Sequence, residues 1–164
     1  MPVSPSANEV RETLRCLRAT TPYFTRTAAD LTDSQLRRPP AEGSWSVHEV
    51  LAHLRGCADV QGVWIARMLA EDTPTIRYAS SRTGMRKTDY ANQEFQVFLR
   101  AFARQRTDLV KTLTSLEVAD WVRGATFTGT TPGWTQTVFA AASGLATHEQ
   151  AHFKQIAAAA DASR

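Results

Sequence analysis

The chain has 164 residues, of which 43% are hydrophobic and 21% charged, with a formal net charge of +3. This length and composition predict a single globular domain, 1–164, that buries about two-thirds of its unfolded surface. The basic residues are spread along the chain, which argues against nucleic-acid binding. The start "MPVSPSANEV" does not look like a signal peptide, no segment reaches the ~20 apolar residues of a membrane helix, and there is no CxxC pair. We therefore expect a cytoplasmic protein without a membrane partner.

Hydrophobic periodicity predicts four long helices and no convincing strand. The segment "TTP" before Tyr23 kinks or restarts the first helix, and "TDSQL" adds a short helical turn after it. Ser46 and Glu49 form a capping box that begins the second helix. The predicted ranges are about 8–30, 46–71, 88–116 and 135–160.

Two predicted connections, about 73–87 and 117–133, are longer than the loops that usually join bundle helices. Long loops at one end of a rigid bundle often form the mouth of a binding site. The pattern as a whole predicts an all-α fold, a four-helix bundle of the up-and-down type with two long connecting loops.

The segment "THEQAHFKQI", 147–156, places His148 and His152 four residues apart on the last predicted helix. Such residues lie about 40° apart around the helix and ~6 Å apart along it. Their stripe continues into Leu145 and Ile156, so both rings should face the core. Two inward imidazoles are either core histidines bonded to neighbours or water, or ligands of one metal ion.

The spacing also matches the HExxH pattern of zinc peptidases, in which a third ligand follows downstream. Only about a dozen residues follow His152, and Asp161 is the sole candidate among them, so a peptidase is not expected. His53, two turns into the second helix and next to the inward-facing Leu54, is a better third ligand.

Other candidates have simpler alternatives. Cys57 follows His53 by four residues and could be a fourth ligand or a reactive thiol, although a small buried hydrophobe is the favoured interpretation. His48 is expected to be solvated in the first helical turn, and Trp45 to be a packing anchor. The basic residues of "SSRTGMRK" could receive the carboxylate of a thiol cofactor, although a solvated loop is favoured; these are Arg82, Arg86 and Lys87.

Taken together, "GSWSVHEVLAHL" and "THEQAHFKQI" resemble the DinB-like superfamily of metal-binding four-helix bundles, which also contains thiol-dependent transferases and maleylpyruvate isomerases. "TPYFTRTAADLTDSQLRRPP" resembles the first helix of that family and its exit. The resemblance implies a metal site made by His53, His148 and His152. In a simple up-and-down bundle the second and fourth helices are parallel, and an axial offset of roughly 10 Å would be needed for these rings to meet. The matching positions are Trp45, Ser46, His53, His148, His152, Gln155 and Ile156.

Three histidine ligands leave open positions on a divalent ion, as in catalytic zinc sites, and they suit zinc, nickel or ferrous iron. The resemblance implies an enzyme that activates a low-molecular-weight thiol, mycothiol or bacillithiol, for transfer to, or isomerisation of, a small electrophilic substrate. The preference for arginine over lysine favours mycothiol. The alternatives are a non-catalytic, stress-related metal-binding bundle, often a homodimer, and a metal-dependent hydrolase. Gln155 could bond a ligand ring or lie at the helix edge, and Glu149 could orient water or substrate or be solvated.

Overall fold

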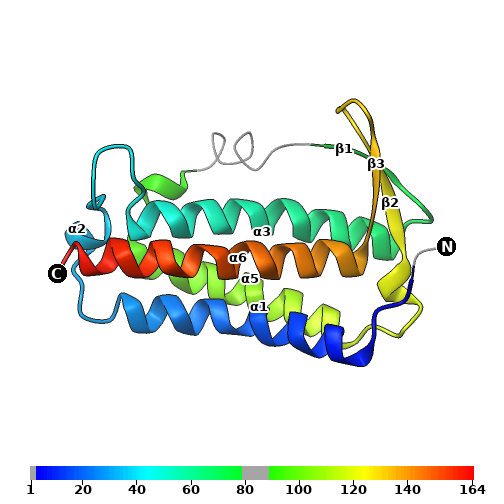
Figure 1. Cartoon of the computed structure of the whole chain (residues 1–164), viewed down its shortest axis with the longest axis horizontal. Coiled ribbons are helices and arrows are strands. Elements are labelled where there is room, and N and C mark those ends of the chain that lie inside the picture. The colour runs from blue at the N-terminus through cyan, green and yellow to red at the C-terminus, as the bar shows by residue number, and fades with distance from the viewer. Residues whose placement is uncertain (1–2, 79–88) are drawn as a thin grey trace.

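The computed structural model describes residues 3–78 and 89–164 of the chain. Four long helices pack side by side in a bundle, so the predicted four-helix bundle is confirmed (Figure 1). Their bounds are Ala7–Thr27 (α1), Val47–Ala70 (α3), Phe95–Thr114 (α5) and Val138–Asp161 (α6). Among the described residues, three short helical elements lie between them: the α-helix α2 (Asp33–Leu36) and the 3-10 helices η1 (Tyr90–Asn92) and η2 (Asp120–Val122).

The predicted capping box begins α3. The Ser46 hydroxyl accepts a hydrogen bond from the Glu49 backbone N–H at 3.2 Å, and the Glu49 carboxylate accepts one from the Ser46 N–H at 2.8 Å. These bonds satisfy two N–H groups that would otherwise lack partners at the helix start. The start of the helix that carries His53 is therefore fixed by local sequence.

Pro22 lies inside α1, which continues through it without a restart. A proline inside a helix removes one backbone hydrogen bond, and packing on both sides of α1 offsets that loss. Tyr23 stacks on Phe153 of α6 with ring centroids 3.9 Å apart, and Phe24 meets Phe102 of α5 edge-on. Tertiary contacts thus keep α1 helical through a residue that predicts a break.

The helices α3 and α6 run in opposite directions. In the segment that leads into α3, the Arg38 carbonyl accepts a hydrogen bond from Ser163, which follows the end of α6. At the other end, Arg123 lies before α6 and its Nε donates to the Met68 carbonyl near the end of α3 at 2.8 Å. An axial offset between two parallel helices is therefore not needed to bring the predicted histidines together.

The helices α3 and α5 run in the same direction, so the order of the bundle is not a strict up-and-down alternation (Figure 1). His48, near the start of α3, packs on Phe95 at the start of α5, and farther along Asp59 accepts a hydrogen bond from Gln105. Parallel neighbours require a connection that returns along the length of the bundle, which accounts for the long segment after α3.

A small sheet covers the end of the bundle where α3 ends and α6 begins (Figure 1). Its strands are Thr75–Arg77 (β1), Gly124–Thr128 (β2) and Trp134–Thr137 (β3), in the order β1-β2-β3. β1 pairs with β2 in parallel and β2 with β3 in antiparallel register. The prediction of no strand was therefore wrong for both long connections.

These strands escaped prediction because they are short, three to five residues each. A run of that length shows little alternation, and the partner of β1, the strand β2, lies in a distant part of the sequence. β3 also occupies the predicted start of the last helix, which instead begins after its N-cap residue Thr137. The third helix begins at Phe95, later than predicted, and its predicted first residue lies outside the described residues.

None of the helices within residues 3–78 and 89–164 combines the length and apolar character that crossing a membrane requires.

Candidate metal centre

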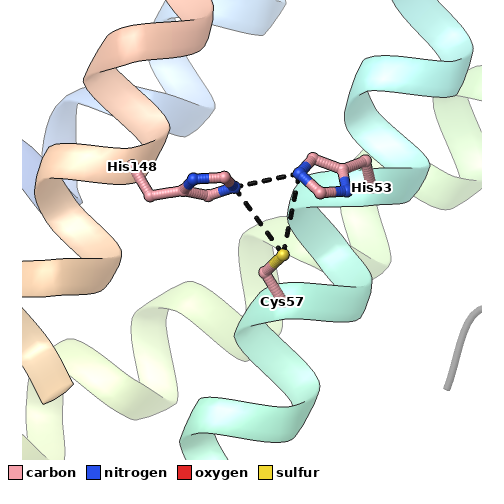
Figure 2. Close-up of side chains that lie close together, drawn as sticks. All are labelled: His53, Cys57 and His148. Carbon is pink, nitrogen blue, oxygen red and sulfur yellow. Dashed lines mark hydrogen bonds between the residues drawn. The ribbon is translucent and has the colours of Figure 1, made fainter. Parts of the chain in front are cut away.

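His53 and Cys57 on α3 meet His148 on α6 in the interface between these two helices (Figure 2). The Nε2 atoms of His53 and His148 lie 2.9 Å apart. The Cys57 Sγ lies 3.8 Å from the first of these nitrogens and 3.7 Å from the second. Donor atoms around a tetrahedral zinc ion are separated by about 3.3–3.6 Å, given metal–ligand bonds of ~2.0–2.3 Å. The three atoms thus have nearly the spacing of ligands around one ion.

Local sequence explains this placement. His53 and Cys57 are four residues apart, so they share one face of α3. Cys57 is only 8% exposed, as the favoured interpretation of a buried small residue required, yet its sulfur also faces the two imidazoles. The alternative role of Cys57, as a donor at the same cavity, is therefore compatible with its position.

His152 stands one helical turn after His148, beside this group. Its ring centroid lies 4.8 Å from that of His148 and 5.0 Å from that of His53. Its Nδ1 donates a hydrogen bond of 2.7 Å to the Oε1 of Gln155, which places the ring proton on Nδ1. The Nε2 of His152 then keeps its lone pair, as a metal ligand requires. The structure brings the three predicted histidines together, and Gln155 contacts one of them.

The electrostatics favour a neutral imidazole at His148. Burial, and to a lesser extent the neighbouring His152, lowers the pKa of His148 below its ordinary value. A neutral ring presents a lone pair on one nitrogen. The two facing Nε2 atoms can share one proton, so that one ring donates a hydrogen bond to the other, or both can present their lone pairs to one cation. The donor set of imidazoles with an adjacent thiol fits a borderline ion such as zinc, nickel or ferrous iron.

Trp45 forms one wall of the site. Its ring centroid lies 4.9 Å from that of His53, and its plane is within 9° of parallel to that of His152 at 6.3 Å. A pocket of about 550 Å³ opens beside the rings of Trp45 and His152. The predicted packing anchor therefore packs directly on two histidines, and a small molecule can approach from the His152 side. The pocket is lined by Pro40, Gly43, Ser44, Trp45, His152, Gln155 and Ala158.

Glu149 has a different role from either one predicted for it. The residue is fully buried, so it is not solvated. Its carboxylate accepts hydrogen bonds from the Thr20 hydroxyl at 2.7 Å and from the Arg106 guanidinium. Consecutive helical residues point about 100° apart, so His148 faces α3 while Glu149 faces α1 and α5. The glutamate of the HExxH pattern belongs to a buried ion pair and does not orient water or substrate here.

His48 also differs from its prediction. It is 2% exposed, and its Nε2–H donates to the Gln93 carbonyl at 2.9 Å, with the ring packed between Phe95 and Phe98. The segment leading into α5 covers the first turn of α3, a contact that local sequence cannot reveal. Burial lowers the pKa of His48.

The basic residues Arg82, Arg86 and Lys87 lie outside the described residues.

The model of the DinB superfamily matches residues 16–156 of this chain. The chain belongs to the DinB superfamily. The resemblance inferred from the tryptophan, histidine and glutamine positions is thereby confirmed. No curated protein matches the chain.

Among solved structures, this DinB-superfamily chain is similar to YfiT from Bacillus subtilis, with a TM-score of 0.79 and 22% sequence identity. The match covers 95% of this chain and 89% of YfiT. YfiT has been described as "a probable metal-dependent hydrolase with an unusual four-helix bundle topology". At this level of identity the similarity establishes a shared fold.

Proposed function

We propose that the chain is a divalent-metal-dependent enzyme that activates a low-molecular-weight, mycothiol-like thiol for transfer to, or isomerisation of, a small electrophilic substrate. The proposed metal ligands are His53, His148 and His152. The observation that carries the metal site is the 2.9 Å approach of the Nε2 atoms of His53 and His148 inside the bundle. The thiol chemistry rests on the family resemblance.

A zinc, nickel or ferrous ion at this position would lower the pKa of a thiol or of water bound beside the histidines. The side chains around it have separate tasks. Gln155 holds the His152 ring through its Nδ1–H and so keeps the Nε2 lone pair available. Trp45 covers His53 and His152 on one side, which limits the access of water from that side. The pocket of about 550 Å³ beside His152 limits the reactant to a small molecule.

Whether the Cys57 sulfur is a metal ligand distinguishes this proposal from a non-catalytic metal-binding protein. If its sulfur joins three histidines as a ligand, the protein occupies all four tetrahedral positions, the arrangement of structural zinc sites. If it does not, one position stays open for a reactant. The sulfur distances of 3.7 and 3.8 Å make this a question that a single substitution can answer.

A second candidate is a metal-dependent hydrolase. The shared fold with YfiT supports it, since that protein has been described as such a hydrolase. The two candidates need the same ligands and differ in the nucleophile, which is a thiol in the first and water in the second.

The metal content of purified protein tests the site itself. Wild-type protein kept away from chelators should carry close to one ion per chain, and His148→Ala should carry little. His48→Gln is a matched control, because His48 is a buried histidine outside the cluster. Less than about 0.2 ions per wild-type chain would exclude a metal site of useful affinity.

The nucleophile is tested with metal-loaded protein, mycothiol and the electrophile monochlorobimane. The proposal expects conjugation faster than in the metal-free control, and Cys57→Ala should retain or raise that rate. Hydrolysis of a small ester without any thiol would favour the hydrolase. Metal binding without either activity, with weaker binding in Cys57→Ala, would favour the non-catalytic protein.

A further inference from the structure

A groove of about 720 Å³ lies between α1 and α5, on a different face of the bundle from the histidines. Its cationic residues are Arg18 and Arg106 on the walls and Lys111 at the edge, and none of its lining residues within the described chain is acidic. Its apolar residues are Pro22, Ala103 and Val110, and the remaining lining residues are Thr21, Thr107, Thr114 and Ser115. The groove therefore combines positive charge, hydroxyl groups and an apolar wall.

Arg106 is the unusual member of this set. It is 4% exposed, and one nitrogen, Nη2, donates to Glu149. Within residues 3–78 and 89–164, its Nε and Nη1 atoms have no hydrogen-bond partner, and neither has the buried hydroxyl of Thr21. Both side chains line the groove. Buried donors without acceptors cost free energy, and the cost is larger for a charged group.

The other cationic groups are either hydrogen-bonded within the protein or exposed to solvent. Arg18 spans the groove from α1 and donates to the Thr114 hydroxyl on α5 at 3.2 Å. Lys111 is exposed and adds positive potential at the groove edge. The unmet donors are thus concentrated at Arg106 and Thr21, next to the apolar wall.

We propose that this groove binds a small organic carboxylate that has an apolar body. The carboxylate would accept hydrogen bonds from Arg106 and from the Thr21 hydroxyl, while the apolar body would lie on Pro22, Ala103 and Val110. A guanidinium group matches a carboxylate in shape and charge. One negative charge is sufficient, because Glu149 already shares the charge of Arg106. The apolar wall favours an organic anion over a strongly hydrated inorganic one.

Benzoate is a suitable probe, with benzyl alcohol as the neutral analogue and inorganic phosphate as the inorganic anion. Binding is measured by calorimetry or by NMR shifts in the full chain. We expect saturable benzoate binding, and weaker or no binding of the other two compounds. Because a carboxylate could also reach a metal ion, His148→Ala is titrated in parallel and should bind benzoate with unchanged affinity.

Arg106→Gln combined with Glu149→Gln removes the cation and leaves a neutral, hydrogen-bonded pair in the core. This double variant should weaken benzoate binding about tenfold or more, since charge-assisted hydrogen bonds are lost. Thr21→Val and Lys111→Gln should each weaken it several-fold, and they keep the test available if the double variant does not fold. Arg104→Gln, an exposed change on the same helix outside the groove, is the matched control and should have no effect.

The proposal would be overturned if benzoate binding did not saturate by about 20 mM, or if benzyl alcohol or phosphate bound equally well. It would also be overturned if the affinity for benzoate were unchanged in the folded double variant, or in both Thr21→Val and Lys111→Gln. Loss of benzoate binding in His148→Ala would instead place the carboxylate at the histidines and would likewise overturn it.

Discussion

Two polar centres on different sides of α6 begin at consecutive residues, His148 and Glu149, and they differ in how their polar groups are paired. Glu149 meets Arg106 and Thr20, so its negative charge is balanced by protein groups of α1 and α5. His148 meets His53, and the Nε2 atoms of the two rings lie 2.9 Å apart. The first centre is an ion pair of protein groups, whereas the second gathers nitrogen and sulfur atoms that could hold a metal ion. Neighbouring residues of one motif thus face different helices and have different polar partners.

The largest effect is expected when one partner of the Arg106–Glu149 ion pair is removed. Glu149→Ala leaves the Arg106 guanidinium buried without its anion and should lower the free energy of unfolding by about 3–5 kcal/mol. Urea denaturation measures the change. The variant carrying Gln at both positions should recover most of the loss, because no charge is left unpaired. A loss below about 1 kcal/mol in Glu149→Ala would show that the pair contributes little to folding.

The histidine centre should instead respond to metal. A ligand at 100 times its dissociation constant stabilises the folded protein by about 2.7 kcal/mol. Addition of a chelator should therefore lower the melting temperature of metal-loaded wild type and of His48→Gln, but not that of His148→Ala. An equal chelator response in His148→Ala would place the ion elsewhere.

Gln155 tests whether the orientation of His152 matters. Gln155→Ala removes the acceptor of the His152 Nδ1–H and should weaken metal affinity about 10–100-fold, the usual effect of losing such a partner. Gln155→Glu keeps an oxygen acceptor at that position and should retain most of the affinity. Competition titrations with a metal indicator measure both variants. Equal affinity in Gln155→Ala and wild type would contradict the positioning role.

The smallest expected effect concerns His48, the histidine that belongs to neither centre. Burial lowers its pKa in the folded state, so the folded protein takes up a proton less readily than the unfolded chain. The stability that this shift contributes is present above the unfolded pKa of about 6.5 and is lost as the pH falls below it. In metal-free protein, His48→Gln should flatten that part of the stability–pH curve. An unchanged curve would mean that His48 titrates alike in both states.

Much of this protein can be predicted from its sequence where the causes are local. The capping box at Ser46, the inward stripe of the last helix and the HxxxH spacing each depend on neighbours within one or two helical turns. These features predict the helices and place His148 and His152 on one side. Together with the position of His53, they also identify the superfamily.

The tertiary structure decided everything that depends on which elements meet. The antiparallel packing of α3 against α6 brings His53 to His148 without an axial offset, and it places the Cys57 sulfur at the same point. The partner of Glu149 and the burial of His48 depend on α5, whose placement follows from a long connection. Short strands formed because their partners came close in space. Helical periodicity in the sequence predicts which face of a helix is buried, but only the packing of the helices determines which residues that face contacts.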